Sequence, residues 1–239
     1  MAFDIFLSSN ETEEKVIDSV IDLDKYPYFR LANDDDVWKT SVQYTSSLRE
    51  KFDKLIVVGI GGSSLGAKTL CHYFRSDNDK VEFWDSIDPH FIQTRFEKIK
   101  DLEKVHWLFV SKSGGTLETL EVLNNVEGLY PKEKRRQFFS VITENKDSHL
   151  KNYADVNNLQ CFDHPLDVGG RFSVLSIVGL MPLAFLIGDE LLTEQIKAKN
   201  WEPTTDLRAF ANMMLNSFER GEWIGVIWPY DEKLKYLDE

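Results

Sequence analysis

The stretch Leu55-Ile56-Val57-Val58-Gly59-Ile60-Gly61-Gly62-Ser63-Ser64-Leu65-Gly66 decides the fold class. Its first four residues are all apolar, which is typical of a strand buried on both faces. The glycines that follow permit a tight turn, and the helical spacing of Leu65, Leu70 and Phe74 comes next. A buried strand that turns directly into a helix indicates one unit of a parallel sheet.

The same alternation of strand and helix continues along the chain. Further short apolar runs lie at Val81–Trp84, Val105–Val110, Phe138–Ile142 and Gln160–Phe162, and Leu117, Leu120 and Leu123 have helical spacing between two of them. Strands that are apolar on both faces and alternate with helices belong to a sheet that is covered on both sides. We therefore predict a doubly wound parallel α/β domain over residues 51–190.

Residues outside this domain form two flanking segments. Residues 1–50 are predicted to be helical, with an apolar stripe over residues 16–21 and a helix at Val37–Arg49 that the acidic run Asp34–Asp36 caps. In residues 191–239 we expect a helical linker that includes Asp206–Glu219, then a strand at Trp223–Trp228. That strand would open a second, incomplete α/β domain.

Composition excludes several classes of partner. The chain has 239 residues with 28 Lys+Arg against 40 Asp+Glu, a net charge of −12, whereas a duplex nucleic-acid binder needs a basic surface. No secretory signal opens the sequence. The longest apolar stretch, Val174–Gly188, has 15 residues and is too short to span a bilayer of about 30 Å, so we expect a buried helix there. Cys71 and Cys161 have no framework spacing and predict reduced thiols in a cytoplasmic protein.

The first glycine cluster, Gly59–Gly66, leaves several interpretations open. A dinucleotide fingerprint that starts at Gly59 would need a glycine at position 64, which is Ser64. In favour of this interpretation, Asp85 follows the next strand and could serve as the acid that binds the ribose. A nucleotide P-loop is rejected because one inserted residue turns Lys68 about 100° around the helix. A tight turn with no ligand also remains open.

The second cluster, Ser111-Lys112-Ser113-Gly114-Gly115-Thr116, predicts phosphate binding. Hydroxyls, one lysine and glycine amides follow a strand and open a helix, where a phosphate monoester finds donors and positive charge. A single helix cap would explain one of the three hydroxyls. In the third cluster, Asp167–Ser173, Arg171 precedes the most apolar helix, and an arginine there needs an anionic partner because an unpaired buried charge is costly. That partner is either a sugar phosphate, a developing oxyanion or simply Asp167.

Taken together, the three motifs closely resemble those of the glucose-6-phosphate isomerase family. They are Gly59–Gly66, Ser111–Thr119 and Val168–Ser176, in the family's order and near its spacing. Any one of them alone could belong to another sugar isomerase (SIS) domain, which has a flavodoxin-like fold. Trp228–Tyr236 further resembles the strand that opens the family's second SIS domain.

The resemblance implies a reaction and a site. The reaction is the reversible aldose–ketose conversion of glucose 6-phosphate and fructose 6-phosphate through a cis-enediol, in glycolysis and gluconeogenesis, without cofactor or metal. Arg171 would be catalytic and would stabilise the cis-enediolate. The residues implied in substrate binding are Gly62, Ser63, Ser111, Lys112, Ser113, Thr116 and Gly170.

The sequence also departs from the family. Members are usually far longer and dimeric, and their glutamate base and their ring-opening histidine and lysine lie in a later region. None of the five histidines matches that histidine, so we expect them at the surface or at strand ends; Glu118 matches a family glutamate and is expected to orient a loop cation. We therefore favour the phosphate-binding N-terminal part of an isomerase over a stand-alone SIS module that binds without catalysis. A dinucleotide-binding oxidoreductase is the weakest alternative, because no hydride-transfer site accompanies Gly59–Gly66.

Overall fold

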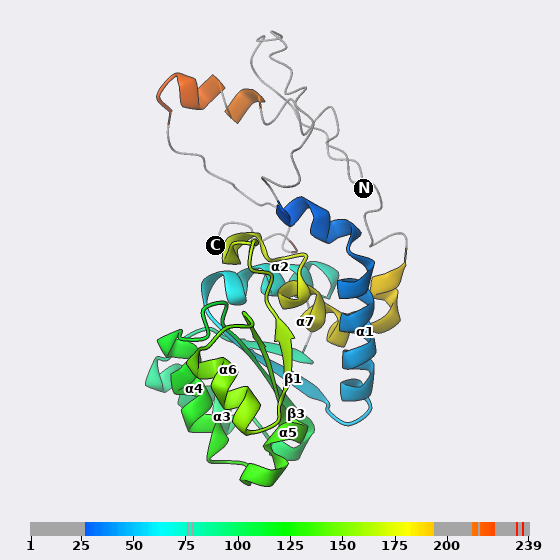
Figure 1. Cartoon of the computed structure of the whole chain (residues 1–239), viewed down its shortest axis with the longest axis vertical. Helices are drawn as coiled ribbons and strands as arrows, with labels where there is room; N and C mark the ends of the chain where they lie inside the picture. The colour runs from blue at the N-terminus through cyan, green and yellow to red at the C-terminus, as the bar shows by residue number, and fades with distance from the viewer. Residues whose placement is uncertain are drawn as a thin grey trace.

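The computed structural model describes residues 27–75, 77, 79–193, 212–214, 216–222, 233 and 236. Its centre is a parallel sheet with the strand order β2-β1-β3-β4-β5 (Figure 1). The strands are β1 Lys54–Val58, β2 Val81–Trp84, β3 Val105–Val110, β4 Phe139–Thr143 and β5 Gln160–Asp163. The doubly wound α/β class and all five strands are thus confirmed, and the order is the flavodoxin-like one.

Helices cover both faces of the sheet (Figure 1). On one face lie α1 Asp35–Arg49, α2 Leu65–Phe74 and α7 Ile177–Ile187, and α7 packs against both of the others. On the other face lie α3 Pro89–Glu97, α4 Leu117–Glu127 and α6 His149–Val156, while the short α5 Arg135–Phe138 leads into β4. Six 3₁₀ segments connect these elements: η1 Pro27–Asn33, η2 Gly61–Ser63, η3 Leu102–Lys104, η4 Lys132–Lys134, η5 Gly170–Phe172 and η6 Gly188–Leu192.

The core lies between the sheet and these helices. All six residues of β3 are buried. The rings of Trp84 on β2 and Trp107 on β3, two strands separated by β1, meet edge to face with centroids 5.0 Å apart. The predicted buried helix is confirmed as α7. The helical stretch Gly170–Leu192 has the length and composition of a membrane span, but 72% of its apolar window is buried inside the protein. It packs as the core helix of a water-soluble protein does.

Two local predictions can be compared with the observed backbone. Asp34 caps α1 as expected, because its carboxylate accepts a hydrogen bond from the Val37 amide at 3.3 Å. β4 begins at Phe139, one residue later than predicted, because the Phe139 amide still donates to the Arg135 carbonyl and completes α5. The first-turn acids of α1 lie near the positive end of the helix dipole.

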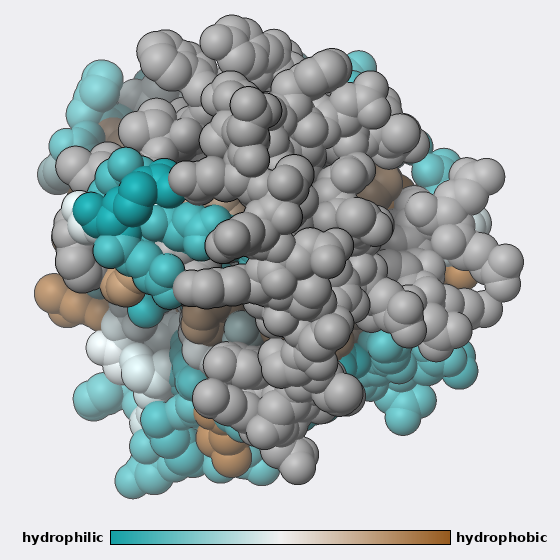
Figure 2. All heavy atoms as spheres, turned by 90° about the horizontal axis from the view of Figure 1, so that it is seen from above, coloured by the Kyte–Doolittle hydropathy of each residue, from teal (hydrophilic) through white to brown (hydrophobic). Residues whose placement is uncertain are grey.

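The flanking segments are described only in part. Residues 212–214 and 216–219 are helical, in agreement with the expected linker helix, whereas the stripe over residues 16–21 and the strand Trp223–Trp228 lie outside the described residues. The domain boundaries near residues 50 and 190 stay predictions. The coloured residues on the face seen in Figure 2 are mostly hydrophilic, with scattered apolar side chains among them.

Candidate functional site

Loops that follow β1 and β3 stand side by side at the carboxyl edge of the sheet. Val58, the last residue of β1, pairs with Trp84 of β2 and with Phe109 of β3, so the strands end nearly level. The strand order reverses between β1 and β3, and in open parallel sheets this reversal is where ligands bind. The first glycine cluster follows β1 and the second follows β3, so both stand at the expected place.

The third cluster folds back onto the first at this edge. A Cβ on Gly62 would lie 2.3 Å from the carbonyl carbon of Gly170 and 2.8 Å from the amide nitrogen of Arg171. The Ser173 hydroxyl also donates to the Gly62 carbonyl at 3.2 Å. Only glycine at position 62 lets the two backbones approach this closely. Its role here is therefore the close contact that brings Arg171 to the reversal point.

Hydroxyl groups hold the second cluster, Ser111–Thr116, in a tight loop. The hydroxyls of Ser111 and Thr116 lie 2.7 Å apart, and the Gly114 amide donates to Ser111 Oγ at 3.1 Å. The Gly115 amide donates to Ser113 Oγ at 3.2 Å. Thr116 occupies the N-cap of α4 but makes no side-chain cap bond to the helix, so an ordinary cap does not account for its hydroxyl.

Lys112 joins the second cluster to the third. Its ammonium donates to the Val168 carbonyl at 2.8 Å and to the Leu166 carbonyl at 3.2 Å. It also lies 3.6 Å from Oε1 of Glu144, a buried carboxylate that forms a second ion pair with Lys146. The hydrogen bond from Lys146 holds the pKa of Glu144 below its ordinary value; burial opposes this, and the charges of both lysines reinforce it.

Glu144 is a residue that the sequence analysis missed. The expected carboxylate partner of the loop cation was Glu118, but the ion pair that the structure shows on Lys112 is made by Glu144. One signal was available, because Glu144 directly follows β4 at the same edge of the sheet. It could not be recognised as part of the site until β4 was known to lie beside β3.

Arg171 lies in η5 with its side chain exposed. The argument that it needs a partner because it is buried was therefore wrong. The simple alternative, an ion pair with Asp167, also fares poorly: Asp167 binds Arg30 instead, with 2.6 Å between Nη2 and Oδ2. An exposed guanidinium at the reversal point is placed to meet an anion that arrives from solvent.

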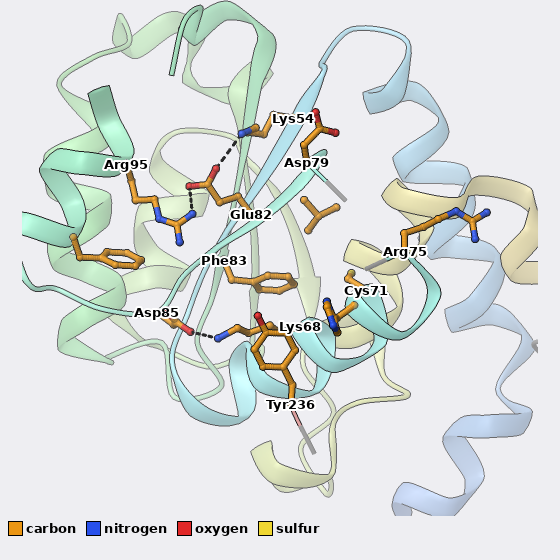
Figure 3. A pocket seen from close by; sticks show the side chains of 13 residues that line it. Lys54, Lys68, Cys71, Arg75, Asp79, Glu82, Phe83, Asp85, Arg95 and Tyr236 are labelled. Atoms are coloured by element: carbon orange, nitrogen blue, oxygen red, sulfur yellow. Dashed lines mark hydrogen bonds and ion pairs between the residues drawn. The ribbon is translucent and has the colours of Figure 1, made fainter. Parts of the chain in front are cut away.

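A separate pocket of about 500 Å³ lies beside the edge strand β2 (Figure 3). Glu82 stands between Lys54 at 3.0 Å and Arg95 at 2.9 Å. Burial alone would raise the pKa of Glu82, but hydrogen bonds from Lys54 and Trp84 and the nearby cations outweigh it and hold the pKa below its ordinary value. None of the predicted site residues lines this pocket.

The same view bears on the two nucleotide interpretations. The Lys68 ammonium points to Asp85, 3.4 Å away, and stands over the Tyr236 ring with its nitrogen 4.7 Å from the centroid (Figure 3). The Asp85 carboxylate, which could have bound a ribose, is thus paired with a lysine of the preceding helix α2. The rejected P-loop lysine points toward β2.

His106 corrects the expectation that all five histidines lie at the surface or at strand ends, whereas His164 lies at a strand end as expected. His106 is fully buried on β3, with Nε2 2.9 Å from Oγ of Ser140, and burial lowers its pKa to about 3. His164 is buried just after β5, and burial lowers its pKa as well. Among the residues that the structure describes, no group of three or more His, Cys, Asp and Glu side chains is arranged to hold a metal ion.

Two curated relatives and one solved structure that this chain resembles are named glucose-6-phosphate isomerase. The chain is 32% identical to the glucose-6-phosphate isomerase of Carboxydothermus hydrogenoformans, over 80% of this chain and 45% of that one. It is also 32% identical to the Thermus thermophilus enzyme of the same name, over 84% and 52%. The crystal structure of a glucose-6-phosphate isomerase from Chlamydia trachomatis superposes with a TM-score of 0.68 at 27% identity, covering 85% of this chain and 41% of that one.

Two further comparisons fix the extent of the likeness. A crystal structure of a hypothetical protein from Thermus thermophilus superposes with a TM-score of 0.75 at 29% identity, over 89% of this chain and 52% of that one. The chain spans about half the length of the curated relatives that it matches. The family model described as phosphoglucose isomerase matches residues 38–235. With most of its length covered by that match, the chain belongs to the phosphoglucose isomerase family.

Proposed function

We propose that this chain forms the phosphate-binding part of a glucose-6-phosphate isomerase, which interconverts glucose 6-phosphate and fructose 6-phosphate through a cis-enediol. One observation carries the proposal: three glycine loops converge at the reversal point of the sheet, joined by the Gly62–Gly170 contact and by the Lys112 ammonium. A turn without a ligand would not need hydroxyls and cations from three separate loops at one place.

The second cluster would bind the phosphate group. Ser111, Lys112, Ser113 and Thr116 surround the amides that precede α4, a helix of 11 residues whose positive end faces the loop. A phosphate dianion would replace the bonds that these groups now make to one another, at charge-assisted strength. Ser63, at the end of η2, would complete the ring of donors from the neighbouring strand.

The carbonyl end of the sugar would lie at Gly170 and Arg171. When the proton leaves C2 or C1, negative charge develops on the neighbouring oxygens, and a fixed guanidinium lowers the energy of that enediolate. The proton itself needs a base, which we assign to no residue of this chain. We place that base in the part of the family's length that this chain does not span.

The proposal also covers the setting of the reaction. We propose a cytoplasmic enzyme that takes hexose phosphates and needs neither cofactor nor metal, and a homodimer for the full-length family member. Nucleic acid and membrane remain unexpected partners, because the formal charge is −12 and the apolar α7 is used inside the core.

Proton NMR of fructose 6-phosphate in D₂O with this chain tests the proposal. We expect saturation transfer from protein to sugar without deuterium exchange at the carbon next to the carbonyl. Lys112→Met should abolish the transfer, whereas Lys98→Met, a change at an exposed lysine after α3, should not. Exchange together with new glucose 6-phosphate would show that the chain carries its own base. The absence of both signals would refute the proposed site.

A further inference from the structure

The loop that carries Arg171 has an outer side that the sheet does not hold. Its inner side is fixed by Gly62 and by the Lys112 ammonium. The outer side contains Asp167 and Phe172, which flank Arg171 along the chain and are both half exposed. Two glycines, Gly169 and Gly170, lie between them, and glycine loses more conformational freedom on ordering than any other residue.

The η1 segment contacts both of these outer residues. The rings of Tyr28 and Phe172 are stacked, with centroids 4.6 Å apart and planes inclined by 16°. Arg30 Nη2 lies 2.6 Å from Asp167 Oδ2, an ion pair between residues 137 positions apart in the sequence. The two contacts are independent of each other in chemistry and in place, and they hold the loop on both sides of Arg171.

Strong contacts in turn fix η1 to the body of the protein. Leu31 and Ala32 are buried, and the Trp38 indole donates to the Leu31 carbonyl at 3.1 Å. Asp34 then caps α1, which packs along α7. Tyr28 and Arg30 therefore belong to a segment that is anchored in the core, and their contacts fix the Arg171 loop relative to α1.

We propose that η1 is a strap and that Tyr28 and Arg30 are positioning residues, which hold the Arg171 loop ready for the sugar end of the substrate. This rests on the proposed function of Arg171. A guanidinium that is held in place before the substrate arrives needs no ordering when it binds, so more of the contact energy is expressed as affinity. The phosphate group, bound by the second cluster, gains much less from the strap.

The test uses two ligands and one protease on the whole chain. The double variant Tyr28→Leu with Arg30→Gln should bind fructose 6-phosphate about tenfold more weakly, because an aromatic pair and an exposed ion pair together supply a factor of this size. Binding of inorganic phosphate should change by less than about twofold. Tryptic cleavage after Arg171, measured by mass spectrometry, should be faster in the double variant than in the unmodified chain. Cleavage after Arg136, an exposed residue of α5, should have the same rate in both.

Conservative variants separate positioning from loss of structure. Tyr28→Phe keeps the ring and should bind fructose 6-phosphate as the unmodified chain does. Arg30→Asp combined with Asp167→Arg restores the ion pair in reverse and should recover most of the affinity that Arg30→Asp loses. Lys151→Met removes another exposed ion pair, to Asp155 on α6, and should leave cleavage after Arg171 unchanged.

The outcomes decide two statements: that η1 holds the Arg171 loop, and that this positions Arg171 for the sugar. Unchanged cleavage after Arg171 in the double variant would overturn the strap, and so would an equal loss of affinity for both ligands. Faster cleavage with unchanged affinity for fructose 6-phosphate would overturn the positioning role. If the unmodified chain binds neither ligand, the proposed function fails, and the protease readout still decides whether η1 holds the loop.

Discussion

Replacing Gly62 with alanine should separate the first and third loops. The new Cβ would lie 2.3 Å from the carbonyl carbon and 2.4 Å from the carbonyl oxygen of Gly170. Optimal contacts between carbon atoms are about 3.5–4.0 Å, so the backbones must move apart by about 1 Å or more. Both partners are backbone atoms, and no side-chain rotation can relieve the overlap.

The expected cost has two parts. Inserting a methyl group into packed structure costs about 1–3 kcal/mol in free energy of unfolding. The shift also stretches the bond from the Ser173 hydroxyl to the Gly62 carbonyl, now 3.2 Å, which is worth about 1 kcal/mol. Arg171 follows Gly170 directly, so the displacement moves its guanidinium as well, and we expect fructose 6-phosphate to bind more weakly because the guanidinium is no longer held in place.

Urea unfolding and titration with fructose 6-phosphate measure the two effects separately. Gly128→Ala is the matched control, because a Cβ there meets nothing within 4 Å and the residue has helical backbone angles. That control should be neutral or stabilise the fold by up to about 1 kcal/mol. If Gly62→Ala were as stable as Gly128→Ala and bound fructose 6-phosphate with unchanged affinity, the close approach of the two loops would be refuted.

Three more predictions follow from buried polar groups and from one strained turn. Burial lowers the folded-state pKa of His106 to about 3, so the unfolded chain takes up a proton at this histidine first as the pH falls. The contribution of neutral His106 to the free energy of unfolding is therefore complete above about pH 6.5 and is lost as the pH falls toward 3. At about pH 4.5 the free energy of unfolding should be lower by roughly 3 kcal/mol. His106→Asn should flatten that part of a urea-unfolding series against pH, and an unchanged slope would contradict the assignment. Glu82→Gln should cost about 1–3 kcal/mol of unfolding free energy, since two cations lose a shared carboxylate that is 14% exposed, whereas Asp155→Asn at an exposed pair should cost under about 1 kcal/mol. Gly114→Ala should weaken inorganic phosphate binding and lower the thermal midpoint, because φ there is +67° and a Cβ would lie 2.1 Å from the Ser148 hydroxyl oxygen; wild-type values for both would show that the loop does not need this conformation.

Much of the fold was readable from local pattern. Most strands contain a run of apolar residues, and each of the first two glycine loops follows such a run. Both the parallel sheet and the edge that carries the loops were therefore predicted from neighbours in the sequence. The error at β4 was also local, because α5 retains Phe138 through a single backbone bond from the next residue. The site residues themselves stay predictions, although the structure brings their loops together.

Groups that interact across the chain were missed for the opposite reason. Glu144 approaches Lys112 only because β4 pairs with β3, and Arg30 finds Asp167 only because α1 packs along α7. Nothing in the local sequence says which oppositely charged group either residue will meet. His106 was misplaced because a single histidine in an apolar run carries no sign of how deeply its strand is covered.

The sequence by itself therefore determined the fold class, the strand boundaries to within about one residue, and the loops where anions are expected to bind. These follow from the period of apolar residues and from the placement of glycines, which act over a few neighbouring residues. Only the tertiary structure decided that Gly62 meets Gly170, that Lys112 bridges two loops, and that η1 contacts the Arg171 loop. Such contacts join residues distant in the chain, and packing of the whole core settles which of the possible pairs form.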